Sequence, residues 1–211
     1  MRYAVIIMSN FSTTDRESEK AGAVILAGGL STRMGRNKVL LPYKDHTLLD
    51  HMVKLLAKSG FDPVLISGDI EGYVSIADQI CEKGPVGGIH AVVSKVSMVL
   101  SPRAWLFVPV DMPLLNEKML KRLAMCKCAY KSDGAVFHDR PLPLFIRMHD
   151  HVIDSINSVA TRMRAGETIS VNHLLSHLNL CKTKYTSHEA VLLMNTNTPE
   201  EWQEAIREFT H

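Results

Sequence analysis

The chain has 211 residues, of which 46% are hydrophobic and 22% are charged, as expected for a single globular domain with one sizeable core. Its 24 Lys and Arg against 22 Asp and Glu leave a net charge of +2, so we predict no binding to nucleic acid or to a membrane surface. The four cysteines lack C-x-x-C spacing, which favours reduced thiols in a cytoplasm over disulfides or structural zinc. They are Cys81, Cys126, Cys128 and Cys181.

The first 20 residues contain one short apolar run, from Ala4 to Met8, followed by a polar segment. The run is too short for a signal-peptide core or a membrane span, and the polar segment has little apolar surface to bury. We therefore predict a flexible N-terminal extension over residues 1–20, or an upstream start with Met8 as the working start. One folded domain is expected over residues 21–211.

Short apolar strands alternate with helical patterns from residue 23 onwards. The run 23–27 is typical of a buried parallel strand, and Thr47 is placed to cap a helix that stops at Ser59-Gly60. Two further strands are predicted at 64–66 and 105–108, and a helical stretch at about 89–98 lies between them. This order predicts an α/β fold, a single Rossmann-like three-layer domain with a mostly parallel central sheet and helices on both faces.

The second half of the chain is less regular. Asn116 is placed to cap a helix, and two short strands follow at 135–137 and 143–146. Near the end, residues 198–201 read Thr-Pro-Glu-Glu, which supplies an N-cap, a proline at the first helical position and a capping-box glutamate. A final helix is therefore predicted after residue 198.

The segment from Leu26 to Lys38 reads LAGGLSTRMGRNK and follows the first predicted strand. Gly28 and Gly29 allow the backbone to approach a phosphate closely, and Arg33 and Lys38 can neutralise its charge. The spacing matches neither the mononucleotide P-loop nor the dinucleotide fingerprint. A bare Gly-Gly would favour an ordinary turn with surface cations, whereas the full string favours binding of nucleotide phosphates.

This string resembles the LAGGxSxRMGxxK signature of the molybdenum cofactor guanylyltransferase family, in the nucleotide-diphospho-sugar transferase-like superfamily. Four later segments resemble the family's acidic residue with GPLxGI, its D-x-P, its R-P-x-P-L-F and its N-x-N-T-P-E motifs. They are residues 78–89, 111–113, 140–145 and 195–200. The resemblance implies a nucleotidyltransferase domain over 21–211 with nucleotide-binding positions at Leu26, Ala27, Gly28, Gly29 and Lys38.

The resemblance also gives roles to three polar residues. Asp78 would accept hydrogen bonds from the N1–H and 2-amino groups of guanine; the alternative is a solvated loop aspartate. Ser67 stands where some relatives carry a nucleotide-contacting asparagine. Asp111, just beyond a buried strand, would bind Mg²⁺ against the phosphates, and the alternative is a turn aspartate before Pro113.

The pterin side of the family's cleft is implied at Asn195 and Asn197, whose amides offer donors and acceptors. Paired asparagines before a helix cap are also ordinary turn chemistry. Thr168 stands where the family often carries an arginine, so the pterin side lacks one cation.

Two histidine pairs invite comparison with metal sites. His149 and His151 flank an aspartate, and His173 and His177 are spaced i, i+4. Neither pair has a third ligand at metal-binding spacing. Solvated or capping histidines are therefore predicted at all four positions.

The resemblance implies transfer of GMP from GTP to the terminal phosphate of molybdenum-molybdopterin, with release of pyrophosphate and formation of the guanine dinucleotide cofactor. Because the attacking phosphate is already anionic, the reaction needs charge neutralisation more than a general base. The predicted catalytic residues are Asp111, Lys38 and Arg33. Mg²⁺ is the predicted cofactor, and GTP and Mo-molybdopterin are the substrates.

The alternatives of the same class are a cytidylyltransferase on the same pterin and a sugar-phosphate nucleotidyltransferase. The alternative of another class is a non-catalytic GTP-binding protein that delivers the cofactor. The expected partners are the small-molecule substrates, with transient contacts to molybdenum cofactor assembly proteins and acceptor molybdoenzymes. A cytoplasmic location is expected, with neither nucleic acid nor a membrane as partner.

Overall fold

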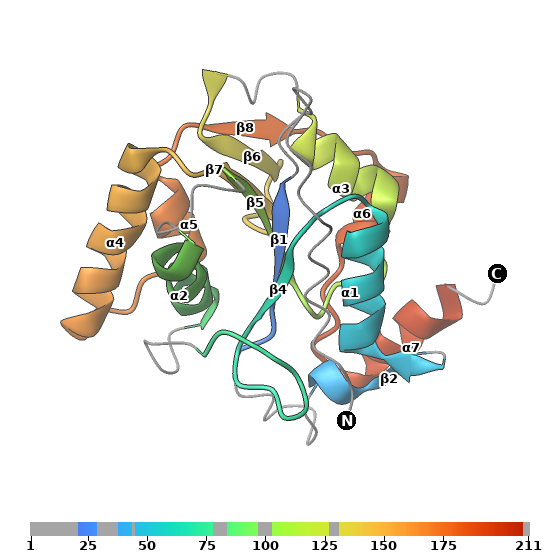
Figure 1. Ribbon diagram of the computed structural model, residues 1–211. Helices are drawn as coiled ribbons and strands as arrows, with labels where there is room; N and C mark the ends of the chain where they lie inside the picture. The colour runs from blue at the N-terminus through green and yellow to red at the C-terminus, as the bar shows by residue number, and fades with distance from the viewer. Residues whose placement is uncertain are drawn as a thin grey trace, which may run out of the picture.

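The computed structural model describes residues 21–28, 38–43, 45–77, 84–96, 103–126 and 131–208. A six-stranded sheet lies between two layers of helices (Figure 1), which confirms the predicted three-layer α/β fold. The sheet strands are β1 (Gly22–Leu26), β4 (Val64–Ser67), β5 (Ala104–Pro109), β6 (Gly134–Phe137), β7 (Leu144–Arg147) and β8 (Leu180–Thr183). A separate hairpin is made of β2 (Pro42–Tyr43) and β3 (His46–Thr47).

The helices connect and cover these strands. The α-helices are α1 (Leu48–Lys58), α2 (Gly84–Val96), α3 (Glu117–Ala124), α4 (Asp150–Arg164), α5 (Val171–Leu175), α6 (Ser187–Ala190) and α7 (Pro199–Glu208). Two short 3₁₀ helices are η2 (Lys38–Leu40) and η4 (Val191–Leu193). Among the described residues, no helix combines the length and apolarity needed to cross a lipid bilayer.

The strand order is β4-β1-β5-β7-β6-β8. β4, β1 and β5 pair in parallel, as do β6 and β8, whereas β7 pairs antiparallel with both β5 and β6. Within the described part of the chain, β7 is thus the one strand of this sheet that runs against the others. The prediction of a mostly parallel sheet is confirmed.

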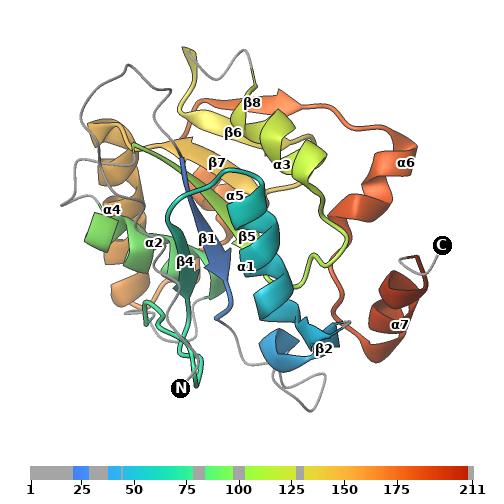
Figure 2. The ribbon, with the colours of Figure 1, turned by 45° about the vertical axis from the view of Figure 1, so that its right-hand side comes forward.

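Two apolar clusters fill the spaces between the sheet and its helices. Successive residues of a strand point to opposite faces, so Ala23 and Ile25 of β1 pack with α1, α3 and α7, whereas Val24 and Leu26 pack with α2, α4 and α5. Figure 2 shows α1 and α3 on one side of the sheet and α2 and α4 on the other. Both faces of β1 and β5 are therefore buried, as their continuous apolar runs predict.

The predicted helix starts are confirmed by their caps. Thr47 accepts a hydrogen bond from the backbone N–H of Asp50, whose carboxylate accepts one in return from the N–H of Thr47. Asn116 caps α3 with its side-chain oxygen. Thr198 and Glu201 exchange the same reciprocal pair at the start of α7.

Three local features differ from what the sequence predicts. The helix predicted from about residue 89 already begins at Gly84, because Pro85 has the φ of a first helical turn and costs no N–H bond there. No helix is predicted over 150–164, where α4 lies, because polar residues outnumber its apolar stripe. Cys181 is disulfide-bonded, whereas Cys126, whose Sγ atom lies 2.8 Å from that of Cys181, is a free thiol.

A testable consequence concerns Gly134, the first residue of β6. A Cβ atom there would collide with the carbonyl oxygen of Phe145 and lie 2.9 Å from the Cα atom of Ile146, both in β7. Backbone atoms cannot yield as a side chain does, so Gly134→Ala should cost about 3 kcal/mol or more of the free energy of unfolding. Urea denaturation measures this loss.

Gly166→Ala is the matched control. Gly166 has φ +101° and no atom within contact distance of a Cβ placed there. Alanine at this position should therefore lower the free energy of unfolding only by the cost of a positive φ, roughly 1–2 kcal/mol. Equal losses in the two variants would show that β6 and β7 are not packed as closely as the structure describes.

Candidate functional site

A cavity of about 220 Å³ lies where β1 and β5 end. These neighbouring parallel strands are in register to their last residues, with Leu26 opposite Pro109. Ligands bind at the carboxyl ends of parallel strands because the segments that leave the strands converge there. Six residues singled out from the sequence line this cavity: Leu26, Ala27, Gly28, Lys38, Asp111 and Asn195.

Backbone hydrogen bonds fix the position of Asp111. The N–H of Val110 donates to the carbonyl oxygen of Leu26 at 3.1 Å, which ties the end of β5 to β1. The carbonyl oxygen of Asp111 accepts from the backbone N–H of Thr196 at 2.8 Å and from the Thr196 hydroxyl at 3.3 Å. Thr196 is itself buried. The segment 195–197 is therefore attached directly to the predicted metal ligand.

Lys38 links the predicted phosphate-binding string to the other side of the cavity. Its Nζ atom lies 3.7 Å from Oδ2 of Asp111 and donates a hydrogen bond of 2.7 Å to Oδ1 of Asn197. The backbone N–H of Asn197 donates in turn to Oε2 of Glu201, the capping residue of α7. Residues predicted separately as nucleotide-side and pterin-side are thus in contact.

The carboxyl group of Asp111 lies in an environment that penalises its negative charge. Burial raises its pKa above the usual range, the ammonium group of Lys38 opposes this rise, and the carboxylate of Glu201 adds to it. The Oδ1 atom of Asp111 is buried and has no hydrogen-bond partner among the described residues. A second cation beside Asp111 would satisfy this oxygen.

Mg²⁺ fits this vacant oxygen. It prefers hard oxygen ligands and is held in nucleotide enzymes by one or two carboxylates together with substrate phosphates. Asp111 supplies such an oxygen at the rim of a cavity, with Lys38 beside it as a further positive charge. The carboxylate of Asp111 is thus of the chemical type that could hold such an ion.

Ser67 lies next to the cavity without lining it. The backbone N–H of Ala27 donates to the carbonyl oxygen of Ser67 at 2.8 Å, and Ser67 as a whole residue is 1% exposed. A Cβ atom on Gly88 would lie 2.7 Å from Oγ of Ser67, so that hydroxyl faces helix α2. The Ser67 hydroxyl thus lies against the start of α2, whose Pro85 lines the cavity, and its contact with nucleotide stays a prediction.

Three of the predicted site residues, Gly29, Arg33 and Asp78, lie outside the described residues. Other residues that line the cavity are not predicted individually from the sequence. Val39, Pro85 and Leu142 supply apolar walls to the cavity. The GPLxGI-like and R-P-x-P-L-F-like segments, to which Pro85 and Leu142 belong, could have indicated them.

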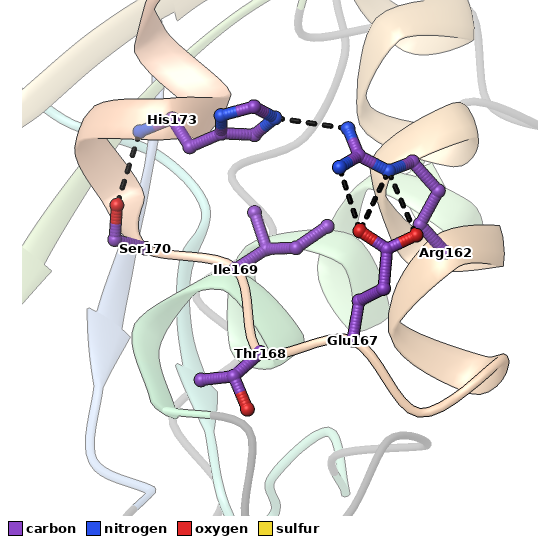
Figure 3. A pocket seen from close by; sticks show the side chains of 6 residues that line it. All are labelled: Arg162, Glu167, Thr168, Ile169, Ser170 and His173. Carbon is purple, nitrogen blue, oxygen red and sulfur yellow. Dashed lines mark hydrogen bonds and ion pairs between the residues drawn. The ribbon is translucent and has the colours of Figure 1, made fainter.

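A second hollow of about 350 Å³ lies between the end of α4 and the start of α5. Figure 3 shows Arg162, Glu167 and His173 pointing toward one another there, while Thr168 points away. Arg162 donates three hydrogen bonds to the carboxylate of Glu167, so its charge is already matched within the pair. The carboxylate of Glu167 therefore differs from that of Asp111, whose buried Oδ1 atom has no hydrogen-bond partner among the described residues.

The fold and the cavity together define a nucleotide-binding α/β domain, and comparison with known proteins agrees. Residues 23–177 match the family model described as the MobA-like NTP transferase domain. A molybdenum cofactor guanylyltransferase from Xanthomonas euvesicatoria is 33% identical over 188 residues, which cover 88% of this chain and 94% of that protein. A probable molybdenum cofactor guanylyltransferase from Bacillus mycoides is 28% identical over 206 residues, 91% of this chain and 98% of that one.

A solved structure supports the same fold. Molybdopterin-guanine dinucleotide biosynthesis protein A from Archaeoglobus fulgidus superposes with a TM-score of 0.69 at 17% identity, covering 90% of this chain and 98% of that one. The chain is therefore a nucleotidyltransferase of the MobA-like NTP transferase family, and within it belongs to the molybdenum cofactor guanylyltransferases. The resemblance noted in the sequence is confirmed.

The contact between Lys38 and Asp111 predicts a measurable change in pKa. Lys38→Met removes the cation that opposes the effect of burial, so the pKa of Asp111 should rise further above its usual range. Carbon-detected NMR of the aspartate carboxyl groups across a pH titration measures it. Lys121→Met is the control, because Lys121 pairs with Glu117 on the exposed side of α3. If the pKa of Asp111 is the same in Lys38→Met as in the unaltered protein, the two groups are apart in solution.

Proposed function

We propose that GTP reacts with molybdopterin in the cavity at the ends of β1 and β5, with Mg²⁺ bound by Asp111. In this reaction the terminal phosphate of the pterin attacks the α-phosphorus of GTP, pyrophosphate leaves, and the pterin gains GMP. The observation that carries the proposal is the buried Asp111 carboxylate, whose Oδ1 atom lacks a partner among the described residues while Lys38 flanks its Oδ2 atom.

Charge is the main obstacle to this reaction, because both reactants are anions. A phosphate nucleophile is already ionised near neutral pH and needs no side chain to remove a proton. Lys38 can bind a phosphate oxygen from its place beside the strand ends, and Gly28 leaves the end of β1 without a side chain at the cavity wall. Arg33, from the same glycine-rich string, is proposed as a second cation. A bound Mg²⁺ ion would offset the negative charge that shifts to pyrophosphate.

Asn197 is proposed as the residue that positions Lys38. Its Oδ1 atom accepts the 2.7 Å hydrogen bond from Nζ, and its own backbone is held by Glu201. A lysine restrained in this way loses less rotamer freedom when it binds phosphate. Asn195 is exposed at the cavity wall, so we retain it as the contact for the polar rim of the pterin.

The preference for guanine is assigned to Asp78, on the grounds of the sequence resemblance. Cytidine or sugar-phosphate chemistry remains the rival within the same class, and a GTP-binding delivery protein is the rival outside it. Pyrophosphate release, measured with GTP, CTP, UTP and ATP in the presence and absence of molybdopterin, separates all three. We further propose that the enzyme works in the cytoplasm, where it meets cofactor assembly proteins and acceptor molybdoenzymes only transiently.

The role given to Asp78 leads to a prediction about nucleotide choice. Asp78→Ala removes an acceptor that pairs with the N1–H and 2-amino groups of guanine, and cytosine does not present these groups as a pair. The ratio of kcat/KM for GTP to that for CTP should therefore fall by about tenfold or more. An equal loss for both nucleotides would assign Asp78 to the fold or to the metal.

Asp111→Asn tests the metal site directly. The substitution keeps the size of the side chain and removes its negative charge, so the protein should stay folded while Mg²⁺ binds more weakly. Turnover should fall by about a hundredfold, well beyond any loss of GTP affinity, because the ion acts mainly as charge shifts in the transition state. Raising the Mg²⁺ concentration should restore part of the rate.

Asp154→Asn, on the exposed side of α4, provides the matched control and should behave as the unaltered enzyme. The measurements are kcat, GTP affinity and melting temperature for both variants across a magnesium titration. Near-normal kcat in a folded Asp111→Asn protein would remove this residue from the metal site.

A further inference from the structure

Three side chains that the reaction does not use meet at the opposite edge of the sheet. Asp133 directly precedes β6, which runs in the same direction as β5, so it lies at the amino ends of the parallel strands while the cavity lies at their carboxyl ends. His149 and His151 follow β7 and begin α4. Antiparallel pairing of β6 with β7 brings the start of the first strand beside the end of the second.

The carboxylate of Asp133 is held firmly in place. Its residue is only 8% exposed, and its Oδ2 atom accepts a hydrogen bond of 2.8 Å from the backbone N–H of Asn179. Its own N–H donates to the carbonyl oxygen of Asn179, and its carbonyl oxygen accepts from the N–H of Arg147. Three backbone hydrogen bonds therefore fix the position of the Asp133 carboxylate.

The two histidines approach the remaining oxygen of this anion. Nε2 of His151 lies 2.6 Å from Oδ1 of Asp133, and Nδ1 of His149 lies 3.9 Å from the same atom. The three ligand atoms all lie within 4.8 Å of one another. His149 occupies the N-cap position of α4 but makes no capping hydrogen bond with its side chain. A third candidate ligand, which the local spacing does not reveal, comes from the residue 16 positions before His149.

A tetrahedral ion is within reach of these atoms after a small movement of both rings. Bonds of roughly 2.1 Å place the ligand atoms of a tetrahedral zinc site about 3.4 Å apart. The Nε2 atom of His151, hydrogen-bonded to Asp133 at 2.6 Å, would therefore move away from Oδ1, and Nδ1 of His149, at 3.9 Å, would move closer. Both histidine side chains are at least half exposed, so their rings can make the small adjustment without disturbing the core. A water molecule would complete the four ligands.

We propose that Asp133, His149 and His151 bind a divalent transition-metal ion of the zinc type. Two imidazoles with one carboxylate form a ligand set for Zn²⁺ and its neighbours, whereas Mg²⁺ prefers oxygen ligands throughout. The site is thus chemically distinct from the one at Asp111. An ion there would join the start of β6 to the start of α4 and stabilise the folded chain, because metal binding contributes to folding when the unfolded chain holds no preformed site.

The second histidine pair, His173 and His177, serves as a comparison for the proposed site. Nε2 of His173 and Nε2 of His177 lie 3.4 Å apart, which is also short enough for a shared ion. The guanidinium group of Arg162, however, lies 2.9 Å from Nε2 of His173 and repels a cation. The metal-ligand grouping identified among the described residues comprises Asp133, His149 and His151 alone.

Zinc binding to the full-length protein, freed of any histidine tag and of metal, tests the proposal. Isothermal titration with Zn²⁺ is made on the unaltered chain, on His149→Ala/His151→Ala and on the matched control His173→Ala/His177→Ala. The first double variant should lose a binding event or weaken it by at least about tenfold, and the control should retain it. Zn²⁺ should raise the melting temperature of the unaltered chain and of the control, and raise it less in the first variant.

Two further measurements keep the result unambiguous. The melting temperature of each variant without metal reports whether the variant is folded. Asp133→Asn keeps an oxygen for the N–H of Asn179 and should weaken Zn²⁺ binding, as His149→Ala/His151→Ala does. Pyrophosphate release from GTP should be unchanged in His149→Ala/His151→Ala, because the cavity lies at the other edge of the sheet. Equal Zn²⁺ affinity in all three proteins, or a loss that follows His173 and His177 instead, would overturn the proposal.

Discussion

The arrangement of the cavity depends on a carboxylate that is buried where a negative charge is costly. Asp111 lies at the end of β5 with Lys38 at 3.7 Å and with one oxygen that has no hydrogen-bond partner among the described residues. An isolated charge in such a place would be strongly destabilising, so neighbouring cations are needed to offset it. Lys38, the cation beside Asp111, can also bind a phosphate group, so the same pair of residues would serve both the fold and the proposed reaction.

The sheet provides the rigidity that this cluster requires. β1 has parallel neighbours on both sides and helices over both faces, so the ends of β1 and β5 are fixed relative to one another. The C-terminal segment then returns to this edge, where Thr196 binds the backbone of Asp111 and Asn197 binds Lys38. Three parts of the chain that are distant in sequence are thereby held within hydrogen-bond distance, as transfer between two bound substrates demands.

The two candidate metal sites differ in the chemistry of their ligands. Asp111 offers only oxygen and faces a cavity in which substrate phosphates can complete the coordination of a hard ion. Asp133, His149 and His151 offer two nitrogens at the opposite edge of the sheet, where the ion would join two elements of structure. Ligand type and place in the fold would therefore keep a magnesium function and a zinc-type function apart.

The local features of this protein follow from its sequence, because caps, apolar periodicity and the glycine-rich string act over a few residues. Thr47, Asn116 and Thr198 start their helices as predicted, and the motifs in the sequence indicate both Lys38 and Asp111 as site residues. The tertiary structure alone decided that Asn197 reaches Lys38, that Ser67 faces α2 and that Asp133 joins two histidines. These contacts depend on strand order and on the antiparallel β7, and spacing along the chain carries no record of which strand edges meet.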